Sequence, residues 1–191
     1  MKIGLFFGTF DPIHLGHTQI AQAVFNMNIV DKIWFIVTPE SPFKKNKIIA
    51  SKTDRIAMVS LALQSHSNFS PSSIEFDLPP PYYTAKTLRH ITRKHSSDQF
   101  ILIMGSDNYS NIHSWNEAEY ILKNFQICVY DRDGYKYNNT ITPLQPKGRY
   151  IDVSSSYIRT HIECKSTERW LNQKVSIYIK QHCLYSQHIE F

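Results

Sequence analysis

The residues of this sequence best suited to chemistry are two histidines, His14 and His17, three positions apart. They lie in the stretch Gly8-Thr9-Phe10-Asp11-Pro12-Ile13-His14-Leu15-Gly16-His17, which joins a short apolar run to the first turn of a helical pattern. At this spacing both rings face one side of the helix start. Ring N–H groups, together with the backbone N–H groups of a helix N-terminus, form an anion site.

A zinc site and a pair of incidental surface histidines are the rival interpretations. Zinc would require a third ligand, and no H-E-x-x-H pattern is present. Two glycines, a proline and an acidic residue surround the histidines, which disfavours an incidental pair. The G-x-G-x-x-G fingerprint of dinucleotide-binding folds does not follow the apolar run. Phosphate binding is therefore the interpretation we favour.

The elements that must position these residues alternate along the chain. Apolar runs predict strands at 3–7, 33–37, 73–78, 100–104, 126–130 and 149–153. Helical spacing predicts helices from Gly16, after a cap at Ser51 or Thr53, and at 83–95, 115–122, 156–162 and 175–182. This order indicates an α/β protein with a doubly wound, mostly parallel sheet and helices on both faces. We expect one Rossmann-like domain over 1–191, with a helical part from about 154 to 191 packed on it.

Ligands of such folds bind beyond the carboxyl ends of the strands, at the switch point of the sheet. The turns that follow residues 7, 37, 104 and 153 should therefore lie close together. Because these turns are far apart in sequence, their clustering tests the predicted topology.

Composition excludes several classes. A 42% hydrophobic and 13% aromatic content over 191 residues excludes disorder. No apolar stretch reaches the ~20 residues of a membrane helix, and Asp11 and Pro12 end the first apolar run too early for a signal peptide. Three cysteines without a C-x-x-C pair disfavour disulfides and a cysteine zinc site, so we expect a cytoplasmic protein. A net charge of +5 without a recognised motif predicts no nucleic-acid partner.

Two motifs resemble those of the H-x-G-H nucleotidylyltransferases, which transfer a nucleoside monophosphate from a triphosphate to a phosphorylated acceptor. The first is G-T-F-D-P-I-H-L-G-H, and the second is Val153-Ser154-Ser155-Ser156-Tyr157-Ile158-Arg159, which is similar to I-S-S-T-x-[IV]-R. The resemblance implies that His14, His17 and Arg159 contact the reacting phosphates. It implies ATP binding by a larger set: Gly8, Thr9, Phe10, Gly16, Gly105, Asp107, Ser154 and Ser155.

Intermediate segments resemble the bacterial nicotinate mononucleotide adenylyltransferases, which make deamido-NAD from ATP and nicotinate mononucleotide. These segments are P-E-S-P-F-K-K at 39–45, R-I-A-M at 55–58, P-Y-Y-T-A-K-T-L at 81–88, and M-G-S-D-N at 104–108 followed by Trp115. The resemblance implies that Lys44 is catalytic and that Trp115 stacks on the pyridine ring beside Tyr83 and Thr84. Because the lysine loop is one residue shorter than in the family, either Lys44 or Lys45 could reach phosphate.

The implied reaction is one direct displacement, in which the acceptor 5′-phosphate attacks the α-phosphorus of ATP and pyrophosphate leaves. Its demands are in-line positioning and neutralisation of charge, without a protein nucleophile. Mg²⁺ should arrive bound to the ATP phosphates, and no dedicated metal site is predicted. The predicted partners are therefore two small molecules, ATP and nicotinate mononucleotide.

Two alternative functions and the oligomeric state stay open at this point. A phosphopantetheine adenylyltransferase shares both terminal motifs, but Trp115 and the segment at 83–88 disfavour it. A non-catalytic nucleotide-binding regulator would be expected to lack one of the charged residues, and all are present. The oligomeric state is not determined, and a homo-oligomer is compatible with the sequence.

Overall fold

A five-stranded parallel sheet in the order β3-β2-β1-β4-β5 is the centre of the molecule. The computed structural model describes residues 1–40, 49–132, 143–146, 151 and 153–186. The strands are β1 (Lys2–Gly8), β2 (Lys32–Val37), β3 (Phe69–Ser72), β4 (Gln99–Gly105) and β5 (Gln126–Tyr130). The order reverses between β1 and β4, which confirms the predicted α/β class and places the switch point there.

Alternation along each strand sends side chains to two separate cores. In β1, Phe6 contributes to one hydrophobic cluster, whereas Ile3 and Leu5 contribute to the other. In β4, Ile103 and Leu102 divide in the same way. Both faces are apolar because both are covered by helices, which is why these strands read as continuous apolar runs.

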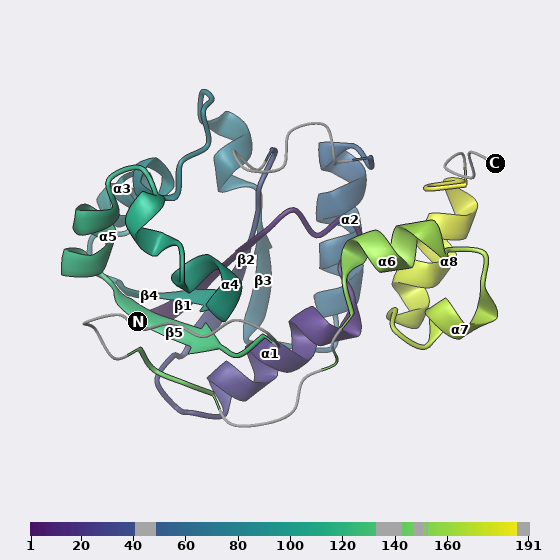
Figure 1. Ribbon diagram of the computed structural model, residues 1–191, viewed down its shortest axis with the longest axis horizontal. Coiled ribbons are helices and arrows are strands. Elements are labelled where there is room, and N and C mark those ends of the chain that lie inside the picture. The colour runs from purple at the N-terminus through teal and green to yellow at the C-terminus, as the bar shows by residue number, and fades with distance from the viewer. Residues whose placement is uncertain (41–48, 133–142, 147–150, 152, 187–191) are drawn as a thin grey trace.

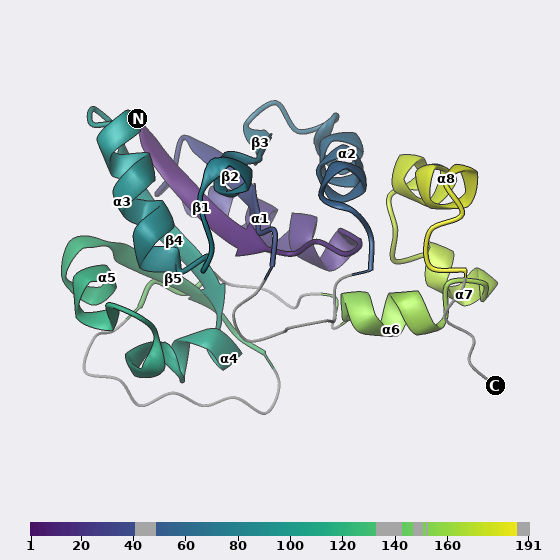
Figure 2. The same ribbon diagram turned by 90° about the horizontal axis from the view of Figure 1, so that it is seen from above.

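Helices cover the two faces of the sheet (Figures 1 and 2). The first cluster receives side chains from α1 (Leu15–Phe25), α2 (Lys52–Leu63) and α8 (Gln173–Gln181). The second receives them from α3 (Thr84–Lys94) and α5 (Ala118–Asn124). Five shorter elements complete the part of the chain that the structure describes: α4 (Ser106–Tyr109), α6 (Ser155–Thr160), α7 (Lys165–Glu168) and the 3₁₀ turns η1 (Ile74–Asp77) and η2 (Ile112–Ser114).

Two helix predictions are confirmed with their caps. Ser51 precedes α2, and its hydroxyl accepts a hydrogen bond from the backbone N–H of Asp54 at 3.1 Å. Thr53 lies inside the helix instead. The prediction for 83–95 also holds, because Tyr83 and His95 cap α3 at its two ends.

The predicted strand at 73–78 is wrong. The edge strand β3 ends at Ser72 and contains Pro71, which an edge tolerates. Ile74 to Asp77 then form the 3₁₀ turn η1, which buries the Glu75 carboxyl. The apolar alternation of Ile74 and Phe76 resembled a strand, but tertiary packing of Glu75 beneath α3 requires a turn.

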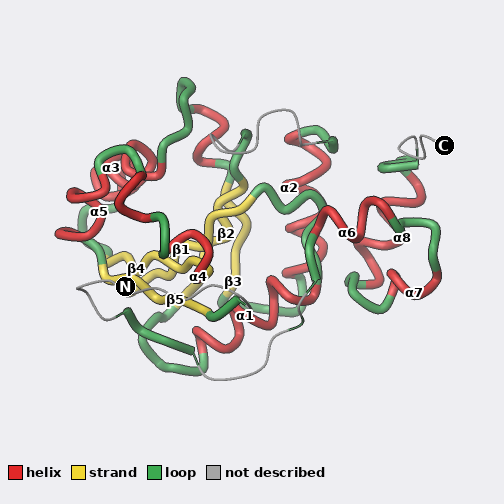
Figure 3. The backbone as a smooth tube through the Cα atoms, in the orientation of Figure 1, coloured by secondary structure: helices red, strands yellow, loops and turns green. Residues whose placement is uncertain are grey.

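The helix predicted at 115–122 is displaced. Trp115 caps η2, and α5 starts at Ala118. The predicted strand at 149–153 lies largely outside the described residues. The remaining C-terminal predictions hold within a few residues: α6 and α8 are helices, and the described part after Val153 contains helices and loops (Figure 3).

The C-terminal helices lie beyond α2 in Figure 2. Val175 and Ile179 of α8 are buried in the same cluster as Met58 and Val59 of α2. Burial of this apolar stripe is what attaches α8 to the rest of the molecule.

Candidate active site

The carboxyl ends of β1 and β4 lie side by side at the switch point. Gly8 ends β1 and Gly105 ends β4, and the two strands pair in register through Phe6 and Ile103. The chain leaves β1 toward α1 and leaves β4 toward α4, which form parts of opposite faces. Such a divergence opens the crevice in which ligands of this fold class bind.

His14 and His17 meet at the start of α1. His14 is the N-cap residue, and its backbone N–H donates to Nδ1 of His17 at 3.2 Å. The two rings stack, with centroids 3.7 Å apart. Because Nδ1 of His17 accepts a hydrogen bond, the proton of the neutral ring resides on Nε2. The structure therefore brings the two predicted histidines together, and Nδ1 of His17 already accepts a hydrogen bond within the pair.

His14 is neutral at pH 7. Its side chain is buried at 5% exposure, and burial together with the positive charge of Arg132 lowers its pKa to about 3. Its Nδ1 is buried and makes no hydrogen bond to any of the described residues. The ring can thus offer an N–H group to an anion, rather than a permanent positive charge.

The helix N-terminus contributes fewer free backbone donors than its position predicts. The N–H of Leu15 donates to the carbonyl of Trp170 at 2.8 Å, and the N–H of His17 donates to the carbonyl of His14 at 3.0 Å. Gly16 is needed between them, because a Cβ there would lie 2.9 Å from the carbonyl oxygen of Ile151. The close approach of residue 151 therefore explains this glycine.

Arg159 lies against the loop that precedes α1. Its Nη1 donates to the backbone carbonyl of Asp11 at 2.6 Å and lies 3.7 Å from the Asp11 carboxylate. Ser155 donates to the carbonyl of Pro12 at 2.9 Å, and Ser154 caps α6 by accepting from the N–H of Tyr157. Both terminal motifs thus meet at the same loop, although their serines already have backbone partners.

Asp107 and Arg132 form an ion pair beside Gly105. Nη1 of Arg132 lies 3.2 Å from Oδ2 of Asp107, while Oδ1 of Asp107 is buried without a hydrogen bond to the described residues. Asp107 lies within α4 and is not its cap, because Gly105 precedes that helix. The sequence analysis did not single out Arg132, which lies two residues after the end of β5.

The predicted acceptor residues gather around α3. Tyr83 caps α3, and Thr84 is its first residue. Trp115 is half-buried and packs against the second hydrophobic cluster. An ion pair between Arg89 and Glu117 joins α3 to the segment that follows Trp115. Trp115 therefore has a packing role in the second cluster, and it remains partly exposed.

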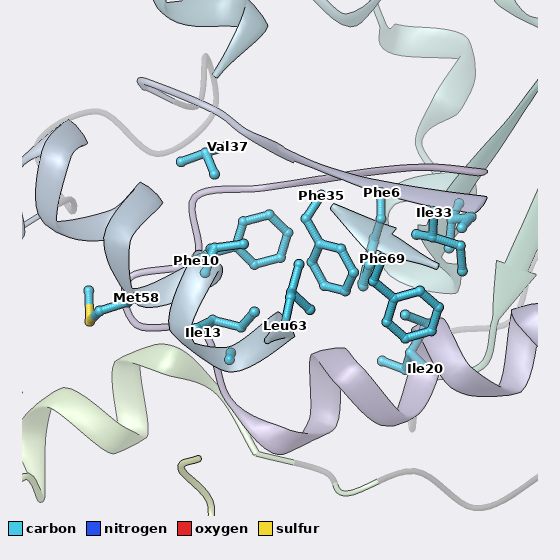
Figure 4. Packing of buried hydrophobic residues seen from close by; sticks show 14 of the residues in the cluster. Phe6, Phe10, Ile13, Ile20, Ile33, Phe35, Val37, Met58, Leu63 and Phe69 are labelled. Atoms are coloured by element: carbon cyan, nitrogen blue, oxygen red, sulfur yellow. The ribbon is translucent and has the colours of Figure 1, made fainter. Parts of the chain in front are cut away.

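The remaining predicted residues differ in accessibility. The Phe10 ring is buried against Phe6 and Phe35, so that only its backbone can reach a ligand (Figure 4). Gly8 and Thr9 are half-buried in the turn after β1. Lys44 and Lys45 lie outside the described residues.

Arg55 binds the backbone of the turn that follows β1, a role that the sequence analysis did not assign to it. It is 1% exposed and donates to the carbonyls of Thr9, Thr38 and Pro39 at 2.8, 2.6 and 2.9 Å, and also to Ala50. The ends of β1 and β2 are thereby joined by one guanidinium, whose planar set of donors suits several carbonyls. Its position in R-I-A-M was the only signal available.

Comparison with known proteins identifies the family. Residues 5–161 match the family model described as cytidylyltransferase-like. A protein of Flavobacterium johnsoniae named "Probable nicotinate-nucleotide adenylyltransferase" is 40% identical over 193 residues, which cover 98% of this chain and 100% of that protein. The chain belongs to the nicotinate-nucleotide adenylyltransferase family. The resemblance predicted from its motifs is confirmed, and the chain is a nucleotidyltransferase.

Less similar proteins also match over nearly the whole chain. A Bacteroides thetaiotaomicron protein of the same name is 32% identical, with 95% of this adenylyltransferase chain and 92% of the relative covered. The structure of Plasmodium falciparum nicotinic acid mononucleotide adenylyltransferase complexed with NaAD has a TM-score of 0.82 at 21% identity, covering 99% of each chain. At this identity the likeness concerns the fold, and it confirms the Rossmann-like architecture.

Two features are absent from the described part of this adenylyltransferase. No helix there combines the length and apolar character needed to cross a membrane. No group of three or more His, Cys, Asp or Glu side chains there is arranged to hold a metal ion.

Proposed function

We propose that this adenylyltransferase transfers AMP from ATP to nicotinate mononucleotide, giving nicotinate adenine dinucleotide and pyrophosphate in NAD biosynthesis. The observation that carries the proposal is the meeting of both terminal motifs at one loop. His14, His17 and Arg159 lie there together, at the carboxyl end of β1. Relatives up to 40% identical over nearly the full length carry the name of this activity.

The reaction is a single displacement. An oxygen of the acceptor 5′-phosphate forms a bond to the α-phosphorus of ATP, and the bond from that phosphorus to the bridging β-oxygen breaks. Pyrophosphate leaves with the bonding electrons. A phosphate monoester is itself a nucleophile, so the chain needs only to position and stabilise the reacting phosphates.

The site residues divide this work by their chemistry. Neutral His14 and its neighbour His17 donate ring N–H groups to phosphate oxygens, with His17 using Nε2. Arg159 supplies positive charge, and Lys44, in the sequence segment after Pro39, is proposed to do so as well. Preorganised donors of this kind lower the barrier because they need no rearrangement as charge develops.

ATP and acceptor are proposed to occupy opposite sides of the switch point. Backbone groups of Gly8, Thr9 and Phe10, with Gly16, Gly105, Asp107, Ser154 and Ser155, form the ATP side. Tyr83, Thr84 and Trp115 form the acceptor side, where Trp115 stacks on the pyridine ring. Mg²⁺ enters as the MgATP substrate, since this ion is usually held by phosphates and water with few carboxylates.

We also propose a domain organisation and a cellular compartment for this protein. The chain acts as one domain, since α8 shares the core of α2. Cys128, Cys164 and Cys183 are free thiols, which supports a reducing cytoplasmic environment.

Pyrophosphate release tests the proposal directly. Purified protein receives MgATP with nicotinate mononucleotide, nicotinamide mononucleotide or phosphopantetheine, and the same mixtures without protein serve as the blank. We expect the fastest release with nicotinate mononucleotide. Release with phosphopantetheine alone would preserve the chemistry but overturn the acceptor. ATP binding without release from any acceptor would favour a regulator.

A further inference from the structure

The end of the described chain reaches back to the loop before α1. Tyr185 follows α8, is 4% exposed, and packs in the first hydrophobic cluster. Its hydroxyl donates to Oδ1 of Asp11 at 2.8 Å, although 174 positions separate the two residues. Tyr185 also has a φ of 70°, in the left-handed region that bulky residues seldom occupy. Such a conformation persists where surrounding contacts hold it, so the inward position of the ring is specified by the fold.

Asp11 is the residue at which three segments of the chain meet. Its carboxylate is 1% exposed and accepts from the backbone N–H groups of Ile49 and Ala50 at 2.9 and 3.1 Å. Arg159 contacts both its carbonyl and its carboxylate. A buried carboxylate is tolerated only where donors satisfy its oxygens, so each donor contributes to its orientation.

The Tyr185 hydroxyl is a permanent member of this donor set. Burial, together with the negative charge of Asp11, raises the pKa of Tyr185 well above its ordinary value. The hydroxyl therefore stays protonated and donates across the pH range in which the protein is folded.

The orientation of Asp11 bears directly on the site, because only two residues separate it from His14. We propose that Tyr185 is a positioning residue, whose hydrogen bond to Asp11 holds the loop between β1 and α1 so that His14 and His17 face the reacting phosphates. This inference rests on the proposed function for its effect on rate, but it does not depend on which acceptor is used. In this proposal, the turn after α8 helps to align the reacting phosphates through Tyr185 and Asp11.

Tyr178 provides a matched control within the same C-terminal part. Its hydroxyl donates to Oδ1 of Asp54 at 3.0 Å, on α2. Tyr185→Phe and Tyr178→Phe therefore each remove one tyrosine–aspartate hydrogen bond. Of the two aspartates, only Asp11 lies in the loop beside the histidines.

We expect Tyr185→Phe to lower kcat about tenfold, because small displacements of aligned groups cost rate strongly. The KM for nicotinate mononucleotide should stay near its wild-type value, and Tyr178→Phe should leave kcat unchanged. Thermal unfolding of both variants shows whether they are folded at the assay temperature. In an Asp11→Asn background, Tyr185→Phe should lower kcat much less than in the wild type, because the pair acts as a unit.

A second readout does not require turnover. The imidazole nitrogen resonances of His14 and His17 should shift in Tyr185→Phe and stay in place in Tyr178→Phe. Unchanged kcat and unchanged resonances in Tyr185→Phe would overturn the inference. Equal losses of kcat in both variants, in proportion to lost stability, would also overturn it. If the wild-type protein transfers no AMP, the proposed function fails, whereas the resonances still decide the role of Tyr185.

Discussion

The backbone N–H of His14 donates to Nδ1 of His17 at 3.2 Å, and the two rings stack at the start of α1. His17 therefore orients the backbone of the residue that caps its own helix, while its Nε2 carries the proton of the neutral ring. The two histidines form one unit, because a change at either one alters the environment of the other.

Replacement of His17 by alanine should lower kcat by about 10²–10³, since it removes a preorganised donor to the reacting phosphates. The KM for ATP should change far less. Steady-state pyrophosphate release measures both parameters. His182→Ala is the control, because His182 is exposed at the end of α8. A near-wild-type kcat in His17→Ala would remove this residue from the mechanism.

Replacement of Trp115 by alanine should raise the KM for nicotinate mononucleotide by about tenfold, as expected for loss of an aromatic stacking contact. The KM for ATP should be unchanged. Trp34→Ala is a matched control, because Trp34 is also half-buried against the second cluster but contacts His95 and Phe100. Equal acceptor KM values in the two variants would leave Trp115 with a packing role alone.

Replacement of Glu75 by glutamine should stabilise the protein at pH 8 and have little effect at pH 5. Burial raises the pKa of Glu75 to about 7, although the hydroxyl of Thr87 donates to its Oε1 at 2.5 Å. The folded state thus binds more protons than the unfolded state between about pH 4.5 and 7, so stability falls as pH rises through that range.

The expected gain at pH 8 is on the order of 3 kcal/mol at most, from the size of the pKa shift. Denaturant unfolding at both pH values measures it. Glu119→Gln, an exposed substitution on α5, should show no such pH dependence. A gain for Glu75→Gln that is equal at pH 5 and pH 8 would contradict the ionisation argument.

Replacement of Arg55 by lysine should lower the free energy of unfolding by several kcal/mol, since a buried carbonyl left unpaired costs about 1–3 kcal/mol. Lysine cannot reach the four carbonyls that Arg55 contacts in the geometry of a planar guanidinium. Urea unfolding should show the loss, and Arg93→Lys, exposed on α3, should show none. Unchanged unfolding midpoints for both variants would count against this role of Arg55.

Much of the scaffold could be predicted because its signals are local. The apolar runs of β1 and β4 and the Ser51 cap of α2 each depend on neighbouring residues, and the structure confirms them. The prediction at 73–78 was wrong because its outcome depends on a distant contact. Glu75 is buried against Thr87, twelve positions away, and a turn rather than a strand makes that contact.

The sequence by itself determined the family, the alternation of strands and helices, and the motifs carrying His14, His17 and Arg159, since each depends on residue type and spacing. Only the tertiary structure decided that Asp11 accepts from Tyr185 and that Arg55 joins the ends of two strands. The physical reason is that a buried polar group must be satisfied by whatever donors or acceptors the fold brings to it. Tyr185 is 174 positions from Asp11, and Arg55 is 46 positions from Thr9, so no local pattern records these contacts.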